Sequence, residues 1–246
     1  MKIFGLTFCA ILAATTSAAT FDIHGIARDF KMRGTDGGHP DFEWVGSGLA
    51  TGMVNATLGS SKRPEYVGTN NYGGVTDAST FDQWYKDVDG VNLSYPITLT
   101  LDNGGSGEIF TYYSASFFPL DNKGFGNQGY SNNYSFTFAY NGAFTYKPGQ
   151  TFEFSGDDDV WVFINNSLVV DLGGVHPEAG GSVNLDTLGL VSGKSYDFDL
   201  YFAERHTTDS HFRMQTSFEL VPEPSTIAAT FGGLILLVSS RRKSRK

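Results

Sequence analysis

The segment VWVFI, within FSGDDDVWVFINNSLVVDLGG at residues 154–174, constrains the fold more than any other feature of the chain. Val160, Val162 and Ile164 fall on one face of a strand, and Trp161 and Phe163 fall on the other. Because successive side chains of a strand point to opposite faces, both faces of this strand must be covered. The pattern predicts a central strand with Trp161 in the core, and a ligand-stacking role for Trp161 is the alternative.

The rest of the chain between the termini is typical of a β protein. Glycine, serine, asparagine and aspartate divide it into short apolar or alternating segments. We expect strands near residues 21–28, 52–58, 91–101, 110–118, 134–140, 142–146, 151–154, 160–164, 168–171, 182–185, 195–202 and 212–220. No fixed-period repeat is present, so the prediction is one β-sandwich or jelly-roll-like domain over residues 20–221.

Two local signals refine this prediction. Thr80 and Gln83 fit a capping box, and Gly90 can end the segment, which predicts one short helix. The Asn141-Gly142 pair predicts a tight two-residue hairpin.

The N-terminus, residues 1–19, has the pattern of a secretory signal peptide. Lys2 precedes an apolar stretch at 3–14, and Ser17 and Ala19 fit the −3 and −1 positions of a cleavage site. A membrane anchor is the alternative, but the apolar stretch is too short to span a bilayer. The only cysteine, Cys9, lies in this segment, so the mature chain is expected to contain no disulfide.

The C-terminus, residues 222–246, carries a second targeting pattern. VPEPST is followed by an apolar stretch at 227–238 and a basic end. The motif residues are Val221, Pro222, Glu223 and Pro224, and the basic ones are Arg241, Arg242, Lys243, Arg245 and Lys246. A short transmembrane segment at about 225–240 is expected, with its basic end in the cytoplasm.

This arrangement resembles the PEP-CTERM sorting signal. The resemblance implies an exosortase as partner, transient anchoring in the inner membrane of a Gram-negative bacterium that makes exopolysaccharide, and delivery to the cell surface or extracellular matrix. An ordinary tail anchor is the alternative.

The charge of the chain argues against one class of partner. Its net charge is −9, and because five basic residues lie in the last six positions, the body is more acidic still. Binding to nucleic-acid phosphates needs a basic surface, so we expect no nucleic-acid partner.

Three consecutive carboxylates, Asp157, Asp158 and Asp159, stand directly before the central strand. Calcium is bound by carboxylate and carbonyl oxygens supplied by loops. We expect Asp157 and Asp158 each to give an oxygen to calcium, with the other ligands from distant loops. A solvated acidic turn is the alternative.

A second polar cluster follows the strand predicted at 195–202. It contains Glu204, Arg205, His206, Asp209 and His211. Zinc binding by His206 and His211 has little support, because a convincing zinc site needs three or four defined ligands. Arg205 is expected to bond a carboxylate of the aspartate turn. His176, in a glycine-flanked loop, is expected nearby.

The body resembles the fibro-slime family over roughly residues 39–220, through HPDFE, TFDQWYKDVDGVN, FFPLD, GDDDVWVFINNSLVVDLGGVH, LDTLGL and YDFDLYFAERHTTDSHF. Its centre is also similar to the domain that anthrax protective antigen shares with yeast flocculin adhesins and some glycosidases. In flocculins an aspartate pair joined by a cis peptide binds calcium, which contacts a sugar hydroxyl pair. The matching positions are Asp157 and Asp158, followed by Ile164, Asn165 and Asn166. Asp159 departs from the usual glycine and is either an added ligand or a solvated neighbour.

Three classes of function follow. The first is a surface or matrix adhesin that binds extracellular polysaccharide through calcium, with Trp161, Asn165, His176, Glu204, Arg205, His206 and Asp209 as candidate contacting or supporting residues. The second is a structural matrix protein without a ligand. The third is a glycoside hydrolase, which needs two carboxylates about 5–10 Å apart in a cleft. No distinctive pair or catalytic motif is present, so we expect no enzyme activity.

Overall fold

The computed structural model describes residues 18–46, 48–105 and 107–222. The strands are β1 (Thr20–Phe30), β2 (Asn92–Asp102), β3 (Phe110–Ser114), β4 (Phe136–Thr145), β5 (Thr151–Gly156), β6 (Asp159–Ile164), β7 (Ser167–Leu172), β8 (Ala179–Asn184), β9 (Ser195–Glu204), β10 (Phe212–Thr216) and β11 (Val221–Pro222). The helices are α1 (Ala78–Phe81) and the 3₁₀ turns η1 (Tyr72–Gly74) and η2 (Leu185–Leu188). Over these residues, the prediction of an all-β fold with one short α-helix is confirmed.

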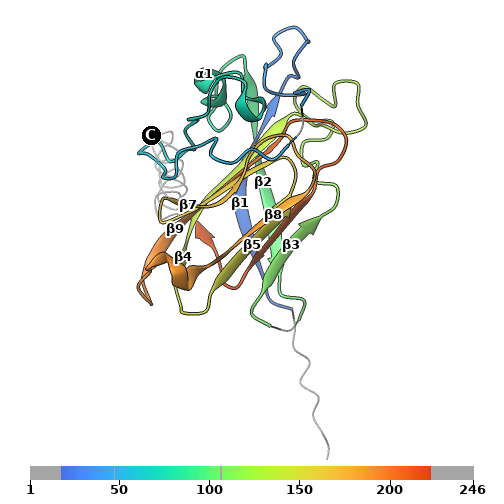
Figure 1. The fold of residues 1–246 in the computed structure, drawn as a ribbon. Coiled ribbons are helices and arrows are strands. Elements are labelled where there is room, and N and C mark those ends of the chain that lie inside the picture. The colour runs from blue at the N-terminus through green and yellow to red at the C-terminus, as the bar shows by residue number, and fades with distance from the viewer. Residues whose placement is uncertain (1–17, 47, 106, 223–246) are drawn as a thin grey trace, which may run out of the picture.

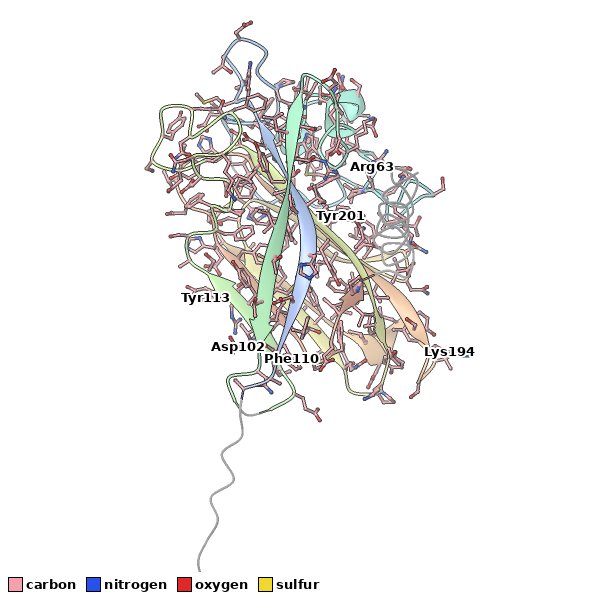
Figure 2. The ribbon with its side chains drawn as sticks, turned by 180° about the vertical axis from the view of Figure 1, so that it is seen from behind. Arg63, Asp102, Phe110, Tyr113, Lys194 and Tyr201 are labelled. Carbon is pink, nitrogen blue, oxygen red and sulfur yellow. The ribbon has the colours of Figure 1, made fainter. Side chains whose placement is uncertain are left out.

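The strands form one antiparallel sheet that folds over on itself. Their order is β7-β6-β9-β4-β1-β2-β3-β10-β5-β8, and β11 pairs with β4. Figure 1 shows the two layers, and Figure 2 shows β1 and β2 along the opposite side. Rings from distant strands meet between the layers, as Phe152 of β5 and Phe198 of β9 do, with their ring centroids 5.1 Å apart. The predicted β-sandwich is therefore confirmed.

Strand β6 is covered on both faces as predicted, but it is not central in the sheet, because it lies second from one end of the strand order. Val160, Val162 and Ile164 belong to the main core between the layers. Trp161 and Phe163 belong to a second core on the outer face. Trp161 has 0% exposure, and its Nε1 donates to Asp171 Oδ1 at 3.1 Å. Trp161 is a core residue, and the ligand-stacking alternative is wrong.

The second core is made by the long connection between β1 and β2, residues 31–91. This connection lays Phe42, Met53 and Trp84 over the outer face of β6 and β9. It runs beside the upper end of the sandwich, where α1 also lies (Figure 1). The connection brings loops from the first third of the chain to the end of the sheet where the aspartates lie.

The predicted helix is shorter than expected and begins with a different cap. Asp77 is the N-cap, and its carboxylate accepts from Ser79 N and Thr80 N. Beyond Phe81, other partners bind the carbonyls that a longer helix would use: Thr137 Oγ1 donates to Trp84 O, and Asn92 Nδ2 donates to the carbonyls of residues 83 and 86. These tertiary bonds replace the helical ladder.

The hairpin predicted at Asn141-Gly142 is wrong, because both residues lie inside β4 and pair with β9. Asn141 Nδ2 donates to Asp199 Oδ1 at 2.7 Å and to the Tyr201 hydroxyl at 2.9 Å. A Cβ atom at Gly142 would lie 2.1 Å from the Tyr140 hydroxyl, so close packing explains the glycine. The strand expected at 52–58 is also absent, and isolated bridges at Val54 and Thr57 replace it.

The terminal predictions fall almost entirely outside the described residues. Residues 1–17 of the predicted signal peptide and residues 223–246 of the predicted sorting signal are not described. Val221 and Pro222 of the motif form β11, which pairs with Ala143 and Gly142 of β4. Within the described ranges, no helix has the length and apolar character needed to cross a membrane.

Candidate functional site

The three aspartates lie where the chain crosses from one layer to the other. β5 ends at Gly156, β6 begins at Asp159, and the peptide bond between Asp157 and Asp158 is cis. Both Asp157 and Asp158 are buried, yet they line a pocket of about 280 Å³. The other lining residues are Val175, His176, Pro177, His206, Thr207, Thr208 and Asp209. We call this cavity the aspartate pocket.

Asp157 is held by the start of β10. Its Oδ1 accepts from the backbone N–H of His211, and its Oδ2 lies 2.9 Å from His211 Nδ1. The hydrogen bond to Asp157 raises the pKa of His211, because the carboxylate favours the protonated ring.

Asp158 is held by two backbone donors from different loops. His176 N donates to its Oδ1 at 3.1 Å, and Arg205 N donates to its Oδ2 at 3.0 Å. Burial raises the pKa of Asp158 well above its usual range, although the Arg205 charge opposes this shift. The Asp158 carboxyl is therefore buried in the pocket wall, and the charge of Arg205 only partly offsets the cost of ionising it.

Asp159 points away from the pocket into the second core. Its Oδ2 accepts from Arg205 Nε at 2.5 Å, and its Oδ1 accepts from Gly174 N at 2.6 Å. Both side chains of the Asp159–Arg205 ion pair have 0% exposure. Asp159 is therefore not a solvated neighbour, and both of its oxygens are bonded within the protein.

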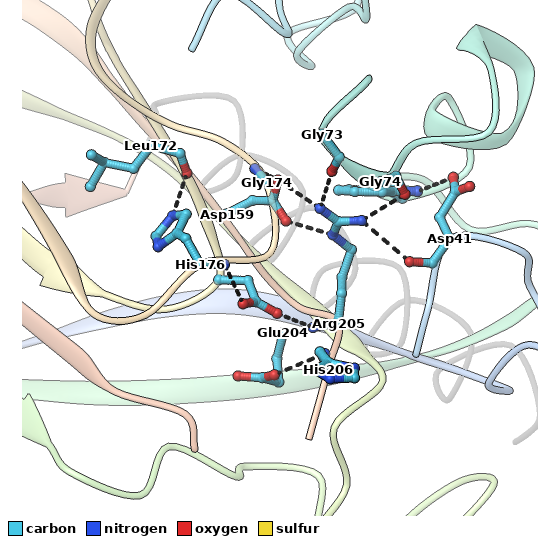
Figure 3. Close-up of polar contacts among 12 residues, drawn as sticks. Asp41, Gly73, Gly74, Asp159, Leu172, Gly174, His176, Glu204, Arg205 and His206 are labelled. Atoms are coloured by element: carbon cyan, nitrogen blue, oxygen red, sulfur yellow. Dashed lines mark hydrogen bonds and ion pairs between the residues drawn. The ribbon is translucent and has the colours of Figure 1, made fainter. Parts of the chain in front are cut away.

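Arg205 joins the aspartates to the β1–β2 connection. Its guanidinium donates to the carbonyls of Asp41, Gly73 and Gly74 at 3.3, 2.7 and 2.8 Å and lies 4.7 Å from the Trp84 ring centroid. Figure 3 shows the guanidinium of Arg205 between Asp159 and the carbonyls of Asp41, Gly73 and Gly74. The bond expected between Arg205 and the aspartate turn is observed, with Asp159 as its partner.

Glu204 is the least satisfied acid of the site. It is fully buried, His206 N donates to its Oε1 at 3.2 Å, and its Oε2 has no hydrogen-bond partner among the described residues. Burial raises the pKa of Glu204 well above its usual range, and the nearby Asp158 adds to the shift. A positive charge near Asp158 would offset the electrostatic repulsion between Glu204 and Asp158.

The two histidines proposed for zinc have different partners. His206 Nδ1 lies 3.1 Å from Glu43 Oε1, whereas His211 faces Asp157. Over the described ranges, no group of three or more His, Cys, Asp or Glu side chains is arranged to hold a metal ion. The structure gives no support to the zinc alternative.

The structure brings most of the predicted site together, but not Asn165. Asp157, Asp158, His176, His206 and Asp209 line the aspartate pocket. Asn165 lies beyond the opposite end of β6, roughly 20 Å along a six-residue strand. There it has φ 51° and its N–H donates to Asp197 O at 3.0 Å. Asn165 is a turn residue and does not belong to this pocket.

Sequence reasoning missed the contribution of the β1–β2 connection. Asp41 is fully buried, accepts from Thr76 N at 2.8 Å and from Trp84 Nε1 at 3.1 Å, and supports the guanidinium of Arg205 through its carbonyl. The HPDFE segment pointed to this region as part of a resemblance, but no local pattern indicated that it would meet residues 159 and 205.

The side chains fit calcium only as part of its shell. Asp157 and Asp158 supply two carboxylates at the pocket wall, whereas calcium takes six to eight oxygens. Backbone carbonyls, water and ligand hydroxyls would complete such a shell. This donor set suits an open site that a ligand can share and does not form a closed structural cage.

Residues 125–225 match the PA14 domain family. Among curated proteins, psiQ of Dictyostelium discoideum is 43% identical over 188 residues, which cover 70% of this chain and 19% of psiQ. psiC of the same organism is 39% identical over 199 residues, covering 74% of this chain and 39% of psiC. The chain spans about a fifth to two fifths of the length of the curated relatives it matches.

Two solved structures are also similar over most of the chain. One is the PA14 domain of the MpAFP antifreeze protein, at 12% identity and a TM-score of 0.36, with 87% of this chain and 93% of that chain covered. The other is a PA14 sugar-binding domain from an RTX adhesin, at 12% identity and a TM-score of 0.34, with 81% and 93% covered.

Proposed function

We propose that this chain, which carries a PA14 domain and is related to the psi proteins of Dictyostelium discoideum, is an adhesive module that binds carbohydrate through calcium in the aspartate pocket. One observation carries the proposal: two adjacent buried carboxylates line an open pocket. Buried charges are costly unless they are paired or bind a metal. Of the three aspartates, only Asp159 has an ion pair that fully buries both partners.

Asp157 and Asp158 would hold the calcium ion. Bound calcium supplies an electrophilic centre that sugar hydroxyls can ligate. The protein's own groups fix the geometry, because His211 N positions Asp157 while His176 N and Arg205 N position Asp158. The resemblance to flocculins, in which the corresponding aspartate pair binds calcium and the metal contacts a sugar, supports the same roles here.

The proposal places the module outside the cell. The signal-peptide pattern and the VPEPST motif with its apolar stretch and basic end support export, transient anchoring and processing by an exosortase-type enzyme. Mass spectrometry of surface-released protein should then find no peptides from residues 241–246. An intact tail on all mature protein would leave a plain membrane anchor.

A glycan array tests the binding proposal. The purified chain is applied in millimolar calcium and again with a chelator, beside Asp158→Asn, which removes the charge but keeps the size. We expect binding to extracellular-type polysaccharides only with calcium, and a loss of binding in Asp158→Asn. Calcium-independent binding would contradict the role of the metal, and absence of all binding would favour a ligand-free structural matrix protein.

The same experiment separates binding from hydrolysis. The proposal assigns no catalytic residue, so the bound glycans should remain intact after prolonged incubation. Release of shortened sugars would favour a glycoside hydrolase instead.

A further inference from the structure

A second pocket adjoins the aspartate pocket and has a different chemistry. It measures about 310 Å³ and is lined by Trp44, Gly46, Gly48, Leu49, Ala50, Asn71, Tyr72, Gly73, Gly74 and Val175. Val175 lines both cavities. We call this cavity the aromatic pocket.

The backbone around Arg205 also connects the two pockets. Arg205 N donates to Asp158 Oδ2, while Arg205 O accepts from Glu43 N at 2.7 Å and from Trp44 N at 3.3 Å. On the other side, Gly48 N donates to Val175 O at 2.6 Å. The walls of the two pockets are therefore held in a fixed relation by short backbone contacts.

The lining of the aromatic pocket suits an uncharged ligand. None of its lining residues is charged, in contrast to the aspartate pocket beside it. Trp44 Nε1 donates to no residue in the described part of the chain, so it is available to a ligand hydroxyl. A sugar ring offers an apolar C–H face with hydroxyls at its edge, which matches an aromatic wall with a polar tip.

The rim of this pocket exposes apolar side chains that a soluble surface normally covers. Of the residues that line it, Tyr72 is 41% exposed and Leu49 is 51% exposed. Exposed apolar groups that gather beside a cavity mark interaction sites more often than isolated ones do.

The aromatic wall is built in advance of binding. The Arg33 guanidinium lies 4.9 Å from the Trp44 ring centroid, and the Tyr72 hydroxyl donates to Thr51 O at 2.9 Å. Gly74 has φ +77°, and a Cβ atom there would lie 2.8 Å from Trp44 Cδ1. Glycine at position 74 thus lets the η1 turn pack directly against the indole.

We propose that the aromatic pocket is a second sugar subsite, so that the two pockets together bind a neutral oligosaccharide of at least two units. This inference rests on the proposed function, because one unit occupies the aspartate pocket and the next contacts Trp44 and Tyr72. The chain therefore selects a polymer or an extended glycan over a single sugar.

Titration with sugars of increasing length tests this inference. The probes are gluco-, galacto- and manno-oligosaccharides of one to four units, in millimolar calcium. For the series that binds, we expect affinity to rise about tenfold from one unit to two, equal to about 1.4 kcal/mol. Trp44→Ala should remove this gain while leaving single-sugar and calcium affinity unchanged, and Tyr72→Ala is the second variant if Trp44→Ala does not fold.

Tyr113→Ala is the matched control, because Tyr113 is an aromatic residue on β3 with 62% exposure that lines neither pocket (Figure 2). It should keep the full gain. Equal affinity for one and two units in the wild type would overturn the subsite and leave the proposed function standing, whereas no binding at any length would overturn both. The wild type could also sediment as a dimer that Trp44→Ala converts to a monomer, while the affinity of the variant still rises with sugar length. That result would assign the apolar rim to self-association and overturn the subsite.

Discussion

Replacing Asp159 by Asn should strongly destabilise the fold, because the change leaves a charged guanidinium buried without its partner. Asp159 and Arg205 are both fully buried, with contacts of 2.5 Å from Nε to Oδ2 and 3.1 Å from a terminal nitrogen to Oδ1. Breaking one side of a buried ion pair typically costs about 3–5 kcal/mol. Because Arg205 keeps its three carbonyl acceptors in this variant, we expect a loss near the lower end, about 3 kcal/mol.

Urea unfolding followed by tryptophan fluorescence measures this loss, since Trp84 packs against the guanidinium. Glu153→Gln is the control, because it breaks the exposed ion pair between Arg213 and Glu153 and should cost less than about 1 kcal/mol. If Asp159→Asn lowers the free energy of unfolding no more than Glu153→Gln does, Asp159 is not a structural partner that Arg205 needs.

Three further outcomes are expected. Phe163→Ala should lower the free energy of unfolding by roughly 3–5 kcal/mol, because the ring is fully buried in the second core; a loss below about 1 kcal/mol in urea unfolding would place it at the surface. Burial raises the pKa of Asp29 to about 6, so the native state keeps a proton that the unfolded chain releases near pH 4. The contribution of Asp29 to the free energy of unfolding should therefore fall by about 3 kcal/mol as pH rises through this window, and Asp29→Asn should lack that part of the pH dependence. Calcium should raise the melting temperature more than magnesium does, since magnesium demands tighter octahedral geometry, and equal shifts would argue against a calcium site.

The two buried faces of β6 could be predicted from the sequence because their signal is local, whereas its position beside the end strand β7 could not. VWVFI is apolar on both faces, and no arrangement other than two covered faces satisfies that pattern. The hairpin predicted at Asn141-Gly142 is absent because both residues have other roles inside β4. Asn141 donates a hydrogen bond to Asp199, and Gly142 leaves space for the Tyr140 side chain. These tertiary contacts override the preference of Asn-Gly for a turn, and a short window of sequence does not contain them.

The candidate site, too, could be predicted only in part from the sequence. Asp157 and Asp158 stand next to each other in the chain, so their clustering was visible. The roles of Asp159 and Asp41 could not be predicted from the sequence, because both depend on Arg205, which is 46 positions from Asp159 and 164 from Asp41. Asn165 was placed in the site through a resemblance, but the six residues of β6 separate it from Asp157 and Asp158.

Calorimetric titration of calcium into the purified chain measures whether Asp157 and Asp158 bind the metal. We expect one calcium ion per wild-type chain, no measurable binding to Asp158→Asn, and near-normal binding to Tyr113→Ala, whose ring does not line the aspartate pocket. Equal calcium binding by the wild type and Asp158→Asn, or no binding by the wild type at millimolar calcium, would contradict the assignment of Asp157 and Asp158 as the ligands of a sugar-binding metal.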